Sequence, residues 1–285
     1  TIAKVSPTIS LSATSGSVNY NATKTFTATT KSPISSSVAG TLTATSADTS
    51  YVTITGGASS SITATSSGVN TTITYKGVKG TNNSTAITLE FTPTDTTNFN
   101  TVTTTYNVSK VSQLSGSISL SEKTATYTGS AIIANTATTN SGGTVTYVYY
   151  SDNSCSTKTT TLTGASSEGG APIDAGTYYV KATVNSTNNY TSASTGCIKH
   201  TINKKSVAVT WGDTTTFTYN NTAQAPTATA TSAITGETIN ITRTTGTNAG
   251  SYTSTASCSS VTGGRAKCDN YNFTGSTKDF TINKA

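Results

Sequence analysis

Threonine alternates with apolar residues along much of this chain. Residues 71–75 read Thr-Thr-Ile-Thr-Tyr, and residues 144–149 read Thr-Val-Thr-Tyr-Val-Tyr. Successive side chains of a β-strand point to opposite faces of its sheet, so a two-residue period is typical of strands with one buried face. Thr is β-branched, which also favours an extended backbone. The pattern therefore predicts strands whose outer faces carry hydroxyl groups.

The composition supports a sheet protein over the alternatives. Of 285 residues, 70 are Thr, and only 10% are charged, against about a quarter in typical globular domains. Low hydrophobicity with low charge can indicate disorder, but disorder does not explain the alternation. No ten-residue window has the 3.6-residue apolar spacing of an amphipathic helix, and no apolar run approaches the ~18 residues of a membrane span. We expect an all-β fold.

Internal repetition predicts the domain organisation. The segment Asp174-Ala-Gly-Thr-Tyr178 recurs as Asn248-Ala-Gly-Ser-Tyr252, and the segment Thr201-Ile-Asn-Lys204 recurs as Thr281-Ile-Asn-Lys284. Three domains are expected, at 1–110, 111–204 and 205–285. The chain also opens with Thr-Ile-Ala-Lys, a version of the same end motif. We therefore expect the first domain to begin with the tail of a preceding repeat, and the sequence to be an excerpt of a longer protein.

Two aromatic positions recur within these repeats. An Asn-aromatic pair precedes the end of each repeat, and a Tyr occupies a similar early place in two of them; the residues are Asn98-Phe99, Asn189-Tyr190 and Asn270-Tyr271, with Tyr127 and Tyr219. The Asp/Asn-Ala-Gly segment predicts a turn before a strand. We expect the Tyr after each turn to pack inward and its hydroxyl to bond to the backbone, as in a tyrosine corner.

The third repeat resembles a bacterial immunoglobulin-like repeat of the MBG type. The resemblance rests on residues 219–226, 248–252, 270–273 and 280–284. The second repeat matches well, and the first matches only through residues 91–100 and its closing strand. Such repeats occur in tandem in very large bacterial surface proteins and adhesins. The resemblance implies three immunoglobulin-like β-sandwiches forming an elongated rod, with no catalytic residues to carry over.

Four cysteines predict two disulfides. Repeat 3 has 19 residue steps from Tyr252 to Tyr271 where repeat 2 has 12 from Tyr178 to Tyr190, and the extra residues fall in the stretch bounded by Cys258 and Cys268. A second excursion, residues 152–170 of repeat 2, carries Cys155, whose expected partner is Cys197. We predict the pairs Cys155–Cys197 and Cys258–Cys268, the former beside the last strand and the latter closing a loop from Ser259 to Lys267. Cystines indicate an oxidising compartment, and hence an extracellular location.

Other chemistries find little support in the sequence. The cysteine spacings do not match a zinc site, and the single histidine, His200, is expected to face solvent on the final strand of repeat 2. Residues 95–98 and 269–270 are weak hints of a calcium site. We expect no metal, no cofactor and no enzyme activity.

An isopeptide cross-link is a more specific chemistry that the sequence could support. Some immunoglobulin-like pilin and adhesin domains form an isopeptide bond between a Lys on the first strand and an Asn on the last, beside a buried acid. This chain resembles them in carrying Lys205, Glu237 and Asn283 in repeat 3, and Lys123, Glu122 or Glu168, and Asn203 in repeat 2. The simpler interpretation is that the two Asn residues are polar domain ends and that the glutamates lie in loops.

The surface charge is weak, with a net charge of +6 from scattered basic residues. No clustered basic stripe predicts nucleic-acid binding, and we expect no membrane insertion. Arg265 and Lys267 lie beside two glycines in the inserted loop, which makes them candidate contacts for an anionic or hydroxyl-rich ligand.

The function predicted is a structural stalk or spacer of a large bacterial surface or fibre protein, whose partners are neighbouring repeats or fibre subunits. One alternative is an adhesin domain that binds host or sister-cell glycan or protein through its inserted loops. Another is an accessory domain of a carbohydrate-active enzyme.

Overall fold

The computed structural model describes residues 2–160, 167–232 and 234–285 and is all-β. These residues contain no α-helix and a single 3₁₀ turn, η2 (Cys268–Asn270). No helix among them is long and apolar enough to cross a membrane. The chain divides into two compact units: the first holds the residues up to Ser117 with Thr139–Thr144 and Val184–Ala193, and the second holds Ile118–Thr138, Val145–Thr183 and Ser194–Ala285.

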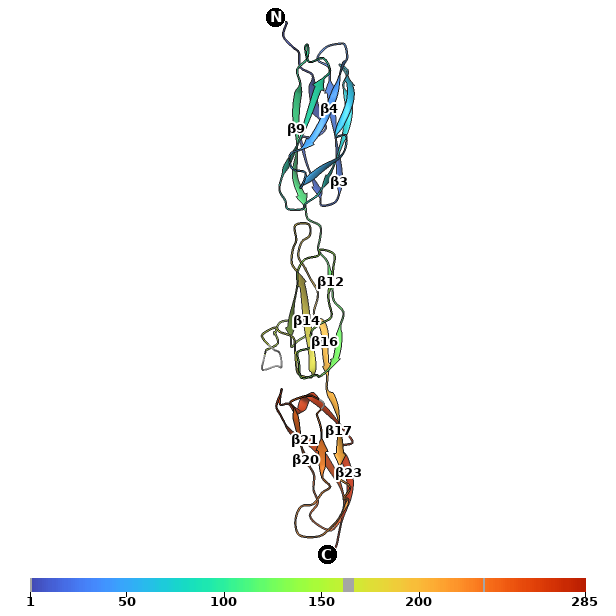
Figure 1. The fold of residues 1–285 in the computed structure, drawn as a ribbon, viewed down its shortest axis with the longest axis vertical. Helices are drawn as coiled ribbons and strands as arrows, with labels where there is room; N and C mark the ends of the chain where they lie inside the picture. The colour runs from blue at the N-terminus through green and yellow to red at the C-terminus, as the bar shows by residue number, and fades with distance from the viewer. Residues whose placement is uncertain (1, 161–166, 233) are drawn as a thin grey trace. The chain divides into compact units, whose positions relative to one another are not determined.

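The first unit is a β-sandwich of two sheets, drawn in blue to green in Figure 1. The four-stranded sheet has the order β1 (Thr8–Leu11), β3 (Thr23–Lys31), β7 (Val69–Gly77), β5 (Val52–Gly56). The five-stranded sheet has the order β2 (Ser15–Asn19), β9 (Val102–Ser112), β8 (Thr85–Pro93), β4 (Val38–Ser46), β6 (Ser59–Ala64).

The core of this unit follows the predicted alternation. Ile87, Leu89 and Phe91 of β8 are fully buried, while the residues between them are exposed. Residues 71–75, expected to be strand, lie in β7, where Ile73 and Tyr75 are buried. Apolar side chains from both sheets form one cluster. The described elements are strands apart from one 3₁₀ turn, so the predicted all-β fold is confirmed.

The second unit contains a further set of sheets before residue 204. The largest has the order β11 (Lys123–Thr126), β16 (Ile198–Asn203), β14 (Gly176–Val184), β13 (Val145–Tyr150), with β15 (Ala193–Ser194) also paired to β14. A two-stranded sheet joins β10 (Ile118–Ser119) to β12 (Thr138–Thr139). Residues 145–149, expected to be strand, lie in β13.

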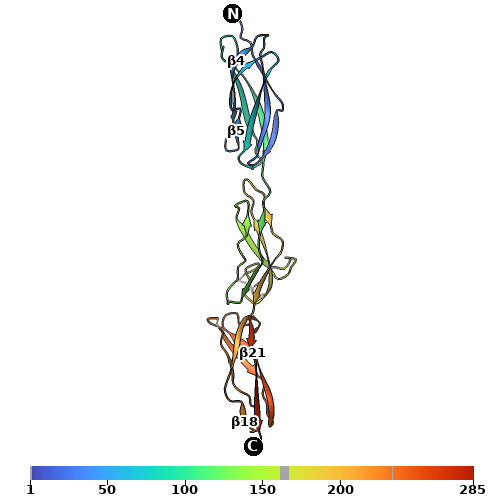
Figure 2. The same cartoon turned by 90° about the vertical axis from the view of Figure 1, so that its right-hand side faces the viewer.

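Two more sheets of the second unit follow residue 204. One has the order β19 (Ala228–Ala230), β17 (Lys205–Trp211), β22 (Tyr271–Thr274). The other has the order β18 (Thr216–Thr218), β23 (Thr277–Asn283), β21 (Gly250–Thr262), β20 (Thr238–Arg243). Figure 2 shows β18 beside the C-terminus, because it pairs with the last strand of the chain.

One three-strand arrangement occurs three times. A short early strand pairs in parallel with a late strand, which pairs on its other edge with an antiparallel strand; the sets are β2/β9/β8, β11/β16/β14 and β18/β23/β21. This recurrence matches the internal repetition of the sequence. The domains 1–110, 111–204 and 205–285 themselves remain a prediction. Residue 1 of the predicted end motif and residues 161–166 of the predicted excursion lie outside the described residues.

The predicted role of the Tyr after each Asp/Asn-Ala-Gly turn is confirmed. The Tyr178 hydroxyl donates a hydrogen bond to the carbonyl oxygen of Asp174 at 3.1 Å, and the Tyr252 hydroxyl donates to that of Asn248 at 2.8 Å. Tyr178 is buried, and the half-buried Tyr252 ring stacks on Phe280 with the ring centroids 5.3 Å apart. Each ring therefore ties the turn to the strand that follows it.

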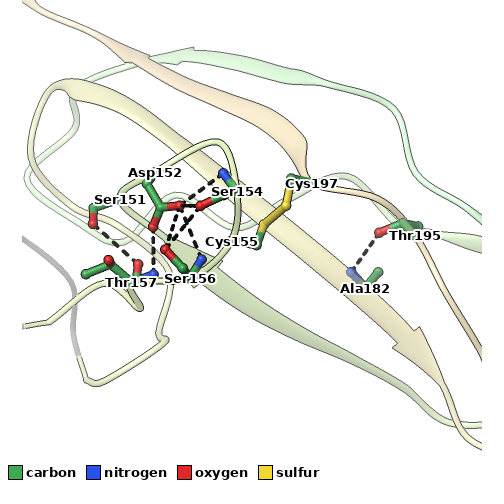
Figure 3. The surroundings of a disulfide bond; sticks show 9 residues. All are labelled: Ser151, Asp152, Ser154, Cys155, Ser156, Thr157, Ala182, Thr195 and Cys197. Atoms are coloured by element: carbon green, nitrogen blue, oxygen red, sulfur yellow. Dashed lines mark hydrogen bonds between the residues drawn. A yellow bond between two sulfur atoms is a disulfide. The ribbon is translucent and has the colours of Figure 1, made fainter.

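The disulfides join the cysteines that the insertions predict. Cys155 bonds to Cys197, which lies directly before β16, and Cys258 bonds to Cys268. Figure 3 shows the first bond beside a turn built on Asp152. The Asp152 carboxylate accepts hydrogen bonds from the backbone amides of Ser154 at 3.0 Å and of Thr157 at 2.6 Å. The described part of this excursion is thus closed by its own hydrogen bonds and by the cystine.

The loop predicted from Ser259 to Lys267 is shorter than expected. Strand β21 continues to Thr262, because it pairs with β20 from Arg243↔Ala256 to Thr238↔Thr262. Cys258 therefore lies within the strand, and the loop proper comprises only residues 263–267. Part of the insertion therefore extends the pairing of β20 with β21, and only the remaining residues form a loop.

The expectation that His200 faces solvent is wrong. His200 is fully buried, and its ring meets that of Tyr149 edge-on, with the centroids 5.5 Å apart. It lies two residues before the buried Ile202 on β16, so the strand's own alternation places it inward. Among the described residues, neither ring nitrogen has a hydrogen-bond partner. Burial lowers the pKa of His200; the nearby backbone of Ile132 opposes this shift, and the charge of Lys123 adds to it.

We predict that His200 makes the stability of the second unit depend on pH. The folded state holds the ring neutral, so its contribution is full above the unfolded pKa of about 6.5 and is lost as the pH falls below it. The variant His200→Leu should escape this loss, which at pH 5 amounts to at most about 2 kcal/mol. Urea unfolding at pH 7.5 and at pH 5 measures how much the free energy of unfolding falls between the two pH values. Lys199→Leu, on the exposed face of β16, is the matched control, and equal pH slopes in His200→Leu and wild type would contradict the prediction.

Candidate functional site

The carboxylate of Asp174 is the centre of a polar junction within the second unit. Asp174 lies in the turn before β14 and is 5% exposed. Its two oxygens accept hydrogen bonds from Nε and Nη2 of Arg265, both at 3.0 Å. Nζ of Lys267 lies 2.6 Å from Oδ2, and the side-chain amide of Asn270 donates to Oδ1 at 3.2 Å. The turn before β14 is thereby held by a loop about 90 residues later in the chain.

The charges of this junction stabilise one another. Burial alone would raise the pKa of Asp174, but the hydrogen bonds from Arg265, Lys267 and Asn270 outweigh it and lower the pKa to about 2. The Asp174 hydrogen bond in turn raises the pKa of Arg265. The two-point contact of a planar guanidinium with a carboxylate also fixes their relative orientation. The carboxylate therefore stays ionised at any physiological pH.

A second buried carboxylate, Glu237, lies in the same junction. Its Oε1 accepts a hydrogen bond from the Tyr127 hydroxyl at 2.5 Å and from the backbone amide of Arg265 at 3.2 Å. Its Oε2 accepts one from the Tyr271 hydroxyl. Burial and the Glu237 hydrogen bond raise the pKa of Tyr127 above its usual range and that of Tyr271 to about 12. Glu237 thus joins a tyrosine that precedes residue 204 to one that follows it.

An apolar cluster surrounds these polar groups. The rings of Tyr127 and Tyr271 meet edge-on, with centroids 5.7 Å apart. The buried members of the cluster come from both sides of residue 204; they are Tyr127, Tyr178, Ile202, Val207, Ile239, Val261 and Tyr271. Because the cluster is continuous, the sheets before and after residue 204 share one buried interior at this point.

The loop that supplies Arg265 and Lys267 needs its glycines. Gly264 has a φ of +48°, and a Cβ there would lie 2.4 Å from Oε1 of Glu237. Such a φ disfavours residues with side chains, and the close approach leaves no room for one. The Cys258–Cys268 bond closes the base of the loop. The backbone amide of Arg265 can therefore reach Glu237 while its side chain reaches Asp174.

A smaller contact of the same kind lies in the first unit. The backbone amide of Gly80, in the segment before β8, donates to Oδ1 of Asn189 at 3.0 Å. The rings of Tyr20 and Tyr190 meet edge-on at 5.9 Å. Here too an Asn-aromatic pair contacts residues of the preceding repeat.

The structure changes the interpretation of the candidate ligand residues. Arg265 and Lys267 do lie together, and both bind Asp174. The Lys267 side chain is still 42% exposed, so the role of the two cations as ligand contacts stays a prediction. Sequence reasoning placed Asp174 only in a turn and missed its partners. A signal was present, because the repeated turn carries Asp in repeat 2 and Asn in repeat 3, and the two cations occur only in the inserted loop.

The other candidate residues are not assembled into a site. Lys205 lies opposite Tyr271 and Asn283 opposite Thr218, so the strand register separates the groups proposed for an isopeptide bond in repeat 3. In repeat 2, Lys123 pairs with His200, three positions before Asn203. The Asp95 carboxylate accepts hydrogen bonds from its own turn. Within the described ranges, no three His, Cys, Asp or Glu side chains group to hold a metal ion.

We predict that Asp174→Asn destabilises the second unit. It keeps the shape of the side chain but leaves Arg265 and Lys267 without their counter-charge. Breaking a buried pair costs about 3–5 kcal/mol, and the partial exposure of both cations reduces this to about 2 kcal/mol. Urea unfolding at pH 7 measures the loss. The control is Glu168→Gln, in the exposed ion pair with Lys158, which should change stability by less than about 0.5 kcal/mol. Equal effects of the two substitutions would contradict the prediction.

We also predict that Gly264→Ala destabilises the protein more than Gly142→Ala does. Both glycines have positive φ, +48° and +64°, but a Cβ at Gly142 would meet nothing within 4 Å. Gly142→Ala should therefore lower the free energy of unfolding only by the cost of holding an alanine at a positive φ, about 1 kcal/mol. Gly264→Ala also displaces Glu237. Thermal unfolding compares the two variants. Similar losses would show that the loop backbone can move without disturbing Glu237.

Comparison with known proteins assigns no family. No family model matches the chain, and no curated protein matches it. Among solved structures, it is similar to domains 5–6 of the S-layer protein SbsC, with 14% identity, coverage of 98% of this chain and 97% of that one, and a TM-score of 0.26. It is also similar to SGBP-B of the Bacteroides ovatus mixed-linkage glucan utilization locus, solved with a mixed-linkage heptasaccharide, with 15% identity, coverage of 94% of this chain and 65% of that one, and a TM-score of 0.14. At these values the two likenesses carry no argument about function.

Proposed function

We propose that this chain is a structural stalk or spacer segment of an extracellular bacterial surface or fibre protein, built from tandem immunoglobulin-like repeats. The observation that carries the proposal is the junction around Asp174 and Glu237. A spacer holds its two ends a fixed distance apart, so the links between successive repeats must resist bending. The buried ion pairs, the Tyr–Glu–Tyr bridge and the shared apolar cluster supply that resistance on both sides of Lys204.

The surface chemistry agrees with such a role. Outward-facing Thr and Ser side chains keep the sheets hydrated with few charges, and the two disulfides favour an oxidising compartment outside the cell. The proposal assigns no catalytic residue. The adhesin alternative is less favoured, because the predicted contacts Arg265 and Lys267 already pair with Asp174.

The test is whether the sheets before and after residue 204 tumble as one body. We expect residual dipolar couplings for the segment before residue 204 (residues 118–138, 145–160, 167–183 and 194–203) and for residues 205–285 of the full chain to fit a single alignment tensor. In the double variant Arg265→Gln/Lys267→Gln, each segment should keep its own fold but require a separate tensor. The exposed pair Lys199→Gln/Lys278→Gln removes the same charge and is the control.

Two outcomes would contradict the proposal. One is separate tensors in the wild-type chain, because a flexible link cannot hold a spacer. The other is tight binding of the wild-type chain on a glycan array that is lost in Arg265→Gln/Lys267→Gln, which would favour the adhesin.

A further inference from the structure

Both internal junctions use the same early tyrosine. Tyr20 follows β2 and Tyr127 follows β11, and the backbone amide of each donates to the late strand of its set, to Ser112 at 2.8 Å and to Asn203 at 2.9 Å. Each ring meets the aromatic residue of the next Asn-aromatic pair edge-on, Tyr190 and Tyr271 respectively. The strand pairing therefore sets the position of a ring that the next repeat covers.

Both junctions also use a backbone amide from the turn that precedes the antiparallel strand. The Gly80 amide donates to Oδ1 of Asn189, and the Ala175 amide donates to Oδ1 of Asn270 at 2.8 Å. Each junction is thus a contact between two surfaces. We call the tyrosine ring and the turn amide of one repeat the docking half, and the Asn-aromatic pair of the next repeat the receiving half.

A third docking half is exposed. The amide of Tyr219, after β18, donates to the carbonyl oxygen of Asn283 at 2.9 Å, as the equivalent tyrosines do. Tyr219 is 37% exposed, whereas in the internal junctions Tyr127 is 1% exposed and Tyr20 is half-buried. Ala249, the equivalent of Ala175, is exposed in the turn before β21. Figure 2 shows β18 at the end of the second unit that carries the C-terminus.

A third receiving half is exposed in the first unit. Val5 forms a parallel bridge with Phe99, as Leu114 does with Tyr190. Asn98 is exposed and Phe99 is half-buried. The side-chain amide nitrogen of Asn98 donates to Asp95 of its own turn at 2.7 Å, whereas that of Asn270 donates to Asp174 of the preceding repeat. In the described part of the chain, no donor is seen on Oδ1 of Asn98, the atom that accepts the turn amide in both internal junctions.

We propose that a second copy of this chain docks end to end on the first: Tyr219 of one copy covers Phe99 of the other, and the Ala249 amide donates to Oδ1 of Asn98. The inference rests on the proposed function, because it extends the junctions within the chain to a junction between chains. The contact is heterologous, so further copies can add to either end in the same way. Two contacts hold a free second copy only weakly, and a covalent connection strengthens the docking by raising the effective concentration of the second copy.

The experiment therefore connects two nearly complete copies through one shared end segment. Residues 1–284 are followed directly by residues 5–285, because Thr281-Ile-Asn-Lys284 takes the place of the similar opening segment. Amide hydrogen exchange is followed at Ala249 of the first copy, with Ala175 as the internal standard for a docked turn. We expect Ala249 to exchange at least tenfold more slowly in the fusion than in the single chain. Asn98→Ala in the second copy should abolish the protection, and Asn107→Ala, on the exposed face of β9, should not.

The possible outcomes separate this inference from the proposed function. If Ala249 exchanges equally fast in the fusion and in the single chain while Ala175 is protected, end-to-end docking is wrong and the internal junction stands. Protection of Ala249 that survives Asn98→Ala would also overturn the docking geometry. If Ala175 itself is unprotected, both proposals fail.

Discussion

The late strand of each three-strand set is hydrogen-bonded on both edges, and this double pairing organises the rest of the structure. Strands β9, β16 and β23 each hold a parallel neighbour on one side and an antiparallel neighbour on the other. The register of the first pairing fixes the tyrosine that follows the parallel strand. The register of the second fixes the turn that precedes the antiparallel strand. Both features come to the same end of the set, so the strand pairing itself builds a docking surface.

The junction in the second unit adds two buried carboxylates to that surface. Taking a carboxylate out of water is costly, and the cost is offset only where good geometry and enough donors meet it. Asp174 has four donor contacts from three side chains, and Glu237 has three donors. Such a set is satisfied in one arrangement of the two segments and left unsatisfied in others. The polar groups thus select a single relative orientation, while the apolar cluster provides most of the buried area.

The disulfides stabilise the two insertions that depart from the repeat pattern. The Cys155–Cys197 bond closes 42 residue steps and the Cys258–Cys268 bond closes 10. By loop-closure entropy they contribute about 4 and about 3 kcal/mol. The shorter bridge has a second effect, because it holds the loop that presents Arg265 and Lys267 to Asp174. One insertion therefore became part of the junction.

The features that the sequence by itself determined depend on neighbours a few residues apart. The alternation around Ile73 and Val148 predicted strands, and the Asp/Asn-Ala-Gly segments predicted where Tyr178 and Tyr252 would bond. His200 was open to the same reasoning, since it shares a strand face with Ile202, but its polarity suggested the wrong side. The tertiary structure alone decided that Asp174 meets Arg265, 91 residues away, and that β21 continues past Cys258. These depend on strand register and on the packing of separate segments, and a two-residue period repeats along the chain without specifying which strand edges meet.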